Sequence, residues 1–151
     1  MPLRRATHDD VPDLVRLRGV MYDAMGVDHT DPAWSASCAD VLRAGLASGA
    51  MAAFGVEEDG RVVAGGVGMV EQRLPGPRNP SGRHGHVQSM ATDVAARGRG
   101  YGRAVFGALM DWFDSVGVSS VDLHATPDGE RLYRPYGFGE PRFTALVRHA
   151  R

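Results

Sequence analysis

Lysine and isoleucine are absent from this chain, and cysteine occurs only once, at Cys38. Without lysine the chain cannot form the Gly-Lys-Ser/Thr end of a P-loop, so that class of nucleotide site is excluded. A single cysteine excludes a disulfide within the chain and fits a reducing cytoplasm, which is the location we expect. Cys38 stands in a helical pattern with no obvious base nearby, so we interpret it as a small buried apolar residue rather than a nucleophile.

Long apolar runs are missing as well. No stretch approaches the roughly 20 apolar residues that cross a bilayer, and Met1–Arg5 leads into no apolar segment of the kind found in signal peptides. The formal net charge is −1, because 17 basic residues, every one an arginine, are set against 18 acidic ones. A nucleic-acid partner usually leaves a basic surplus. We therefore expect neither a membrane nor a nucleic acid as a partner.

The residues that are present indicate a globular domain. Of the 151 residues, 43% are hydrophobic and 23% are charged, which fits one domain over residues 1–151. Apolar residues at helical intervals follow the capping sequence Thr7–Asp10, follow Pro32, and form a stripe through 98–116. Strand patterns lie between them, with Glu58-Asp59-Gly60 as a hairpin turn. The expected segments are an extended start at 2–6, helices at 7–25, 32–49, 98–116 and 128–136, strands at 50–57, 61–70, 86–94, 118–126 and 143–147, and a loop at 74–85.

This order, β-α-α-β-β-β-α-β-α-β, predicts an α/β (α+β) fold with a central mixed sheet flanked by helices. The segment from His86 through Ala125 is a strand–helix–strand crossover, and such crossovers join parallel strands. The remaining strand pairs are hairpin-like and are expected to be antiparallel. We expect helices on both faces of the sheet.

The most informative local pattern is Arg97-Gly98-Arg99-Gly100-Tyr101-Gly102, between a strand and the third helix. The first turn of a helix leaves N–H groups unpaired, and the helix dipole adds partial positive charge there. Glycines let a phosphate approach those N–H groups, and Arg97 and Arg99 add charge-assisted donors. The pattern predicts a diphosphate site at this helix start.

Two other interpretations of this segment compete. A dinucleotide fingerprint requires G-x-G-x-x-G, but the third position is Arg103 when counted from Gly98 and Val105 when counted from Gly100. Glycines can also serve only to tighten a turn. The arginines concentrated at this helix end favour the phosphate site.

Two motifs, which follow each other along the chain in the family's order, resemble those of the GCN5-related N-acetyltransferase (GNAT) superfamily. The cofactor loop of that family reads Gln/Arg-x-x-Gly-x-Gly/Ala, which residues 97–102 satisfy. A later family segment often ends in Leu-Tyr-x-x-x-Gly-Phe, which Leu132–Phe138 matches in full. The opening Arg5–Asp10, followed by a helix, also resembles the start of many members. The resemblance covers nearly the whole chain and is most specific from His86 to Phe138.

The resemblance implies a GNAT-like acyl-CoA N-acyltransferase fold with a splayed sheet, and acetyl-CoA as co-substrate. In the family, the pantetheine arm lies between the fourth and fifth strands and pairs with the fourth, while the pyrophosphate takes N–H groups, here those of Arg99 to Gly102. Many members carry Asn where this chain has Thr126, which can still hydrogen-bond. The implied cofactor-binding residues are Met90, Ala91, Thr92, Val94, Arg97, Gly98, Arg99, Gly100, Tyr101, Gly102 and Thr126.

Acetyl transfer needs a neutral amine, a stabilised oxyanion and a proton for the leaving thiolate. Tyr133 resembles the family's general acid, a role that suits a phenol because it holds its proton at neutral pH. A backbone N–H of Thr92 or a neighbour would polarise the thioester carbonyl. His86 lies by position where histone-type members carry a catalytic glutamate, and imidazole titrates near neutrality. Glu71 is the second candidate for the base, His84 is the third, and a chain of water molecules can also serve.

His84 and His86 are two residues apart on a strand, so they share a face and could meet one metal ion. No third ligand stands at a suitable spacing. We expect no metal.

The acceptor is expected to be an amine of an unidentified small molecule or peptide. We expect its cleft to be bounded by the helix connection at 26–34 and by the closing segment at 139–144. Tyr22, Met25 and Trp34 could line its site with apolar and aromatic surface, and Asp28 and Asp31 could attract a cationic amine. The sequence leaves open a homodimer. It also leaves open three other functions: a non-catalytic acyl-CoA-binding module, a subunit that needs a partner, and an acyltransferase that uses a longer acyl group.

Overall fold

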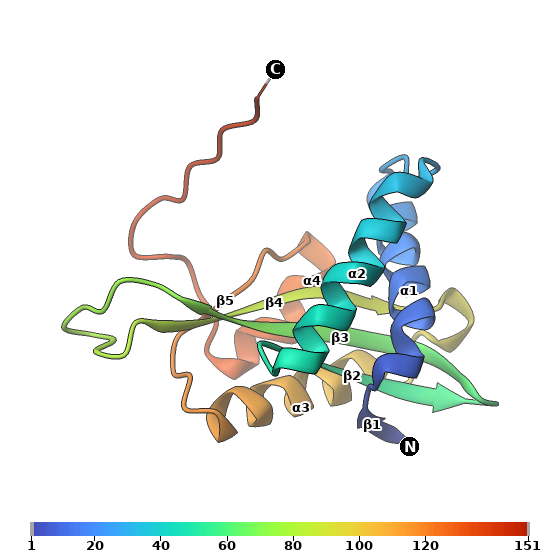
Figure 1. Ribbon diagram of the computed structural model, residues 1–151, viewed down its shortest axis with the longest axis horizontal. Helices are drawn as coiled ribbons and strands as arrows, with labels where there is room; N and C mark the ends of the chain where they lie inside the picture. The colour runs from blue at the N-terminus through green and yellow to red at the C-terminus, as the bar shows by residue number, and fades with distance from the viewer. Residues whose placement is uncertain (1, 151) are drawn as a thin grey trace.

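The computed structural model describes residues 2–150 and is built around a five-stranded sheet (Figure 1). Neighbouring strands are antiparallel except for the fourth and fifth, which run parallel. This mixed sheet and its single parallel pair confirm the fold class expected from the sequence. The strands lie in the order β1 (Leu3–Arg5), β2 (Met51–Glu58), β3 (Arg61–Gln72), β4 (Arg83–Thr92) and β5 (Val121–Asp122).

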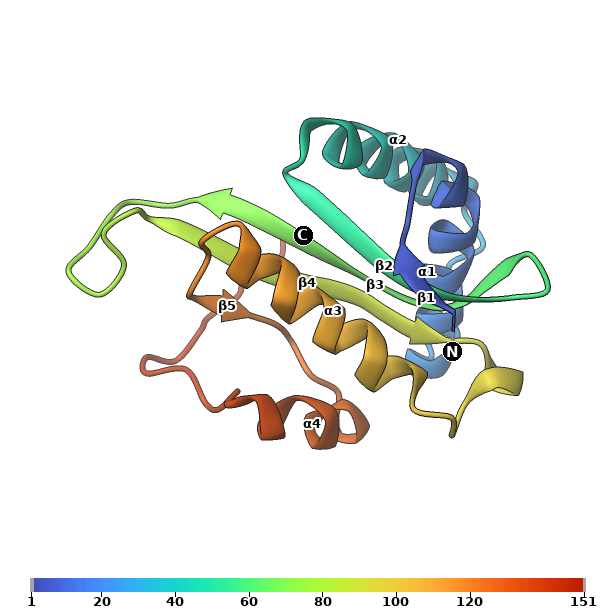
Figure 2. The same cartoon turned by 90° about the horizontal axis from the view of Figure 1, so that it is seen from below.

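Helices cover both faces of this sheet, as Figures 1 and 2 show. On one face, α1 (Val11–Met25) and α2 (Pro32–Ser48) enclose a cluster of buried apolar residues with β2 and β3. On the other face, α3 (Tyr101–Ser115) encloses a second and larger cluster. The remaining helical segments are η1 (His8–Asp10), η2 (Val94–Ala96), α4 (Pro127–Tyr133) and η3 (Arg134–Tyr136).

The stripe predicted on the third helix is the side of α3 that faces the sheet. Phe106, Leu109 and Phe113 are fully or almost fully buried there. Gly85 of β4 lets this helix approach closely, because a Cβ atom at that position would lie 2.6 Å from Cε1 of Phe113. The packing holds α3 against β4 and so fixes where its N-terminal end meets the sheet.

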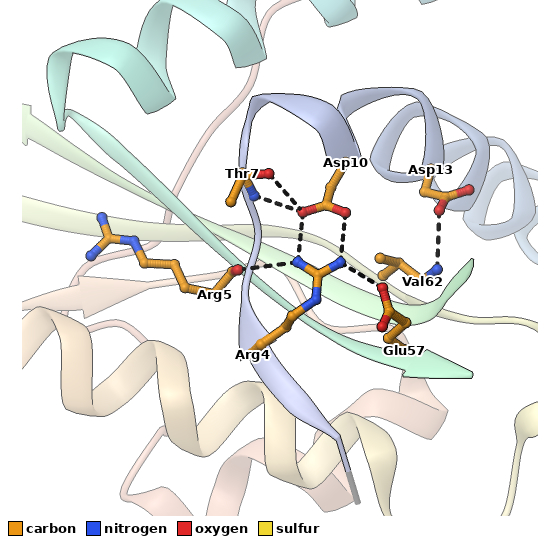
Figure 3. A network of polar contacts seen from close by, with 7 residues as sticks. All are labelled: Arg4, Arg5, Thr7, Asp10, Asp13, Glu57 and Val62. Atoms are coloured by element: carbon orange, nitrogen blue, oxygen red, sulfur yellow. Dashed lines mark hydrogen bonds and ion pairs between the residues drawn. The ribbon is translucent and has the colours of Figure 1, made fainter. Parts of the chain in front are cut away.

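A partly buried ion-pair network joins the start of α1 to the sheet (Figure 3). The Arg4 guanidinium donates to both oxygens of Asp10 at 2.7 and 2.8 Å and to Glu57 at 2.9 Å. Asp10 also accepts the backbone N–H of Thr7 at 2.7 Å, which is the capping contact expected for that sequence. The hydrogen bonds from Arg4, opposed by burial and assisted by Thr7, lower the pKa of Asp10 to about 2.

We expect Asp10→Asn to lower the free energy of unfolding at neutral pH by about 2 kcal/mol, because the folded state holds this carboxylate charged. The native pKa is lowered, so this stabilisation is present above pH 4 and is lost as the pH falls toward 2. Denaturant unfolding at several pH values measures it. The exposed neighbour variant Asp9→Asn is the control. Equal stability of the two variants at neutral pH would contradict the assignment.

The prediction of a strand at 143–147 is wrong. Residues 139–150 form no helix or strand, and this segment runs away from the sheet (Figure 1). Phe143 and Leu146 are 81% and 89% exposed. Alternating apolar residues favour a strand only where a neighbouring strand supplies partners for their N–H and C=O groups, and here the segment lies away from the sheet.

The strand expected at 118–126 is much shorter than predicted. Only Val121 and Asp122 pair with β4, opposite Gly85 and His86. The residues that follow β5 diverge from β4, which confirms the splayed sheet and opens a space between β4 and this segment. Within the described chain, no helix is both long enough and apolar enough for a bilayer crossing.

Candidate active site

Two connected cavities occupy the gap where the chain after β5 leaves β4. The larger has a volume of about 460 Å³ and extends toward the start of α3, and the smaller, of about 390 Å³, extends along β4 toward Gln88. Both are lined by Met90 of β4, by Thr126 after β5 and by Tyr133 at the end of α4. We call these two cavities together the cleft.

A bulge in β4 shapes the wall of the cleft. Val67 pairs with Gln88 and Gly65 pairs with Ala91, so Ser89 and Met90 together stand opposite one residue of β3. Ser89 has a φ of 62°, a conformation that costs energy for a residue other than glycine. A bulge leaves its extra residue out of the ladder, so backbone polar groups at this point are free to face a ligand. No glycine marks the position, and the sequence analysis missed it.

The predicted pantetheine-binding residues divide between two hollows. Met90, Ala91 and Thr92 line the larger cavity of the cleft. Val94 belongs to η2 and lines a separate open hollow of about 790 Å³ beside it. Pairing of Val94 with a bound ligand therefore remains a prediction without support from this geometry.

The glycine-rich corner has the form that its sequence predicted. Gly98 and Gly100 have φ values of 78° and 79°, and a Cβ atom on either would meet nothing within 4 Å. The first hydrogen bond into α3 runs from the N–H of Ala104 to the carbonyl of Gly100 at 3.1 Å. The N–H groups of residues 101–103 therefore have no carbonyl partner within the helix. Of these three residues, Gly102 lines the larger cavity, so the start of α3 lies at the edge of that cavity.

The two arginines of the corner have different surroundings. Arg97 donates to the carbonyl of Thr92 at 3.2 Å and lines the larger cavity of the cleft. Arg99 pairs with Glu58 at 2.9 Å, and Tyr101 donates its hydroxyl hydrogen to the same carboxylate. Hydrogen bonding to Tyr101 and the charge of Glu58 raise the pKa of Arg99. Arg97 thus lines both the cleft and the neighbouring hollow, whereas Arg99 lines the hollow, together with Glu58, but not the cleft.

Tyr133 lies where the two cavities of the cleft meet. Its ring packs against Phe106 with centroids 4.9 Å apart, and the residue is only 8% exposed. Burial raises the pKa of this phenol, so it keeps its proton throughout the neutral range. Thr126 lies nearby, and its hydroxyl accepts the N–H of Gly129 at 3.2 Å and so caps α4. That cap positions the helix that carries Tyr133.

The two leading candidates for the base lie outside the cleft. His86 lines neither cavity, and its Nδ1 lies 2.6 Å from the Oδ1 of Asp122. Glu71 pairs with Arg73 at 3.1 Å and also lines neither cavity. His84 is buried, with Nδ1 3.1 Å from the Ser120 hydroxyl.

Asp122 is the acid shared by two histidines. The Nε2 of His84 lies 3.2 Å from its Oδ2, which is an ion-pair distance without hydrogen-bond geometry. Burial alone would raise the pKa of Asp122, but the hydrogen bond from His86 and the charges of both histidines lower it. In residues 2–150, no group of three or more His, Cys, Asp or Glu side chains is arranged to hold a metal ion.

His124 is the cleft residue that sequence reasoning missed. It lines the smaller cavity together with Tyr133, and its ring lies 5.9 Å from that of His86, edge to face. β5 ends at Asp122, and Asp122 lines neither cavity, so strand alternation gave no signal that residue 124 lies at the cleft. His124 therefore connects the cleft to His86 and Asp122.

The predicted acceptor residues are only partly brought together. Met25 lines both cavities of the cleft, and Tyr22 lines the smaller one. Trp34 lines an adjoining pocket instead. Asp28 and Asp31 line none of these spaces, because Asp28 accepts hydrogen bonds from Thr30 and Asp31 caps α2.

Comparison with known proteins identifies the family of this chain. Residues 18–138 match the Acetyltransferase (GNAT) family. Glucosamine 6-phosphate N-acetyltransferase 1 of Oryza sativa subsp. japonica is 36% identical over 81 residues, which cover 54% of this chain and 47% of that protein. The chain thus spans about half the length of the curated relatives that it matches.

Two solved structures have the same fold over nearly the whole chain. A predicted acetyltransferase from Clostridium acetobutylicum, solved with acetyl-CoA, gives a TM-score of 0.88 at 21% identity, covering 97% of this chain and 94% of that one. A GCN5-related N-acetyltransferase from Ralstonia eutropha JMP134 gives 0.84 at 28% identity, covering 97% of each chain. With the family match over residues 18–138, the splayed sheet and the glycine-rich helix start, this chain belongs to the GNAT acetyltransferase family.

Proposed function

We propose that this protein transfers the acetyl group of acetyl-CoA to the amine of an acceptor, by direct attack while both are bound in the cleft. The observation that carries the proposal is the continuity of the cleft from the free amides of α3, past the β4 bulge, to Tyr133. The fold shared with a structure solved with acetyl-CoA supports the choice of co-substrate.

The cofactor would bind along the larger cavity. The N–H groups at the start of α3 would hold its pyrophosphate, and Arg97 would add a cation. The backbone of Met90 to Thr92 would pair with the pantetheine arm. Free backbone donors at the bulge would stabilise the oxyanion of the tetrahedral intermediate.

Two bond changes and two proton transfers complete the reaction. The neutral amine attacks the thioester carbonyl, the C–N bond forms, and the C–S bond breaks. Tyr133 gives its phenolic proton to the leaving thiolate, and the proton lost from the amine passes to a base. Burial keeps the phenol protonated until that step.

We propose that His124, and not His86, is the base that takes the proton from the amine. His124 lines the smaller cavity with Tyr133, while His86 lies behind it against Asp122. Glu71 is turned toward Arg73, and we assign it no step.

We expect His124→Gln to lower kcat/KM by about a hundredfold, because general-base catalysis contributes at least that much. Steady-state measurement of thiol release gives kcat/KM. The exposed His8→Gln variant should match the parent protein, and an unchanged kcat/KM in His124→Gln would rule His124 out.

The proposal as a whole is tested by a turnover screen. Acetyl-CoA is incubated with amines, amino sugars and peptides, and free thiol and acetylated product are both measured. Glucosamine 6-phosphate belongs in the panel because the name of the rice relative gives it as the acceptor. Equal release of thiol and acetylated amine supports the enzyme. Acetyl-CoA binding without any product favours a binding module, and product that appears only with a second chain favours a partner-dependent subunit.

A further inference from the structure

A third pocket, outside the path proposed for the cofactor, adjoins the acceptor end of the cleft. It has a volume of about 360 Å³ and lies between α1, α2 and the sheet. Tyr22 and Gln88 line both this pocket and the smaller cavity of the cleft, so one molecule could extend from one space into the other. None of residues 97–102 lines it. We call it the side pocket.

The walls of the side pocket are mostly apolar and are fixed in place. Trp34 and Tyr22 meet edge to face with centroids 5.6 Å apart. The indole Nε1–H of Trp34 donates to the carbonyl of His29 at 2.8 Å, so its only polar group is satisfied outside the pocket. Val41, Leu42, Met51 and Val67 supply aliphatic surface. Such a space suits an aromatic or branched aliphatic group.

One cation faces this apolar space. The guanidinium carbon of Arg18 lies 5.3 Å from the centroid of the Tyr22 ring, and the residue is half-buried. Within residues 2–150, Arg18 makes no ion pair with an acidic side chain, whereas Arg4, Arg16 and others do. No aspartate or glutamate lines the side pocket.

The thiol in the side pocket does not balance this charge. Burial raises the pKa of Cys38, against a smaller opposing effect of Arg18, so the thiol stays protonated at neutral pH. Among the described residues the half-buried Arg18 guanidinium has no carboxylate partner, so an anionic ligand group would gain a charge-assisted hydrogen bond there. The apolar walls and Arg18 therefore select two different features of one ligand.

We propose that the acceptor carries, besides its amine, an apolar group of aromatic or branched aliphatic kind and an anionic group that pairs with Arg18. This inference rests on the proposed function, because the amine must reach the cleft. The apolar group fills the side pocket between Trp34 and Met51. The anion is a carboxylate or a phosphate, since both accept hydrogen bonds from a guanidinium.

Binding to the protein saturated with coenzyme A tests this class independently of turnover. The probes separate the two features: tryptophan and leucine carry both, tryptamine lacks the anion, glycine lacks the apolar group, and glucosamine 6-phosphate pairs an anionic phosphate with a polar ring. We expect tryptophan or leucine to bind at least tenfold more tightly than tryptamine and glycine. Tighter binding of glucosamine 6-phosphate than of both amino acids would overturn the apolar part of the inference.

Two variants test whether Arg18 causes the preference for an anion and Trp34 the preference for an apolar group. Arg18→Gln should weaken binding of tryptophan about tenfold and leave tryptamine unchanged, while Trp34→Ala should weaken both. Arg43→Gln, exposed on α2 and outside the side pocket, is the matched control. An equal effect of Arg18→Gln on tryptophan and tryptamine, or no binding of any amino acid probe, overturns the inference. Selective binding of tryptophan without thiol release would leave the ligand preference of the side pocket standing, but it would refute the proposed catalysis and with it the role of that ligand as acceptor.

Discussion

Tyr133→Phe is expected to lower kcat by about a hundredfold or more while the Kd for acetyl-CoA stays within a factor of two or so, because a general acid contributes about 10² to 10⁴ to rate. The substitution removes only the phenolic oxygen. The ring would still pack against Phe106, where the centroids lie 4.9 Å apart, so the end of α4 should keep its position. Stopped-flow or steady-state thiol release gives kcat, and calorimetry gives Kd.

The matched control for this variant is Tyr136→Phe. Tyr136 also packs against Phe106 but is exposed and lines neither cavity of the cleft. It should therefore retain the parent kcat. If Tyr133→Phe and the parent protein turned over equally, the thiolate would have to take its proton from water, and the role proposed for Tyr133 would be withdrawn.

The second large effect concerns cofactor binding at the start of α3. We expect Gly102→Glu to raise the Kd for coenzyme A about a hundredfold, which corresponds to the loss of one or two charge-assisted hydrogen bonds. A side chain at Gly102 would point toward the larger cavity, where the nearest atom to its Cβ is the Cδ2 of Leu132 at 3.8 Å. A carboxylate there would also repel the phosphates.

Gly102→Ala separates this effect from damage to the helix. An alanine Cβ fits the available space, and alanine favours a helix interior over glycine by about 1 kcal/mol. This variant should be at least as stable as the parent and should bind coenzyme A less than tenfold more weakly. Coenzyme A affinity in Gly102→Glu equal to that in Gly102→Ala would show that the phosphates bind elsewhere.

The parts of the fold that depend on local sequence could be predicted. The apolar stripe of α3, through Val105, Leu109 and Phe113, indicates both a helix and the face that it buries. Asp59 and Gly60 have positive φ values of 51° and 76°, as the hairpin turn requires. The open glycine corner at Gly98 and Gly100 was likewise predicted, because the bare backbone is itself the relevant feature.

The parts of the fold that depend on contacts between residues far apart in the sequence were harder to predict. The segment at 143–147 alternates like a strand, but alternation does not specify whether a neighbouring strand is within reach. Counting along β4 to His86 assumed a regular strand, and the bulge at Ser89 adds a residue. Met90 consequently packs toward α3, although a regular alternation would place it on the same face as His86. Only the structure placed His124 at the cleft.

The central claim is that free amides at the glycine corner hold the diphosphate and so direct a thioester toward Tyr133. An amide NMR titration of the intact protein with coenzyme A tests it most directly. We predict saturable shifts that are largest for the amides of residues 98–103, with smaller shifts along β4 from Met90 to Thr92. An absence of saturable shifts, or shifts concentrated on α2 with those amides unmoved, would contradict the account.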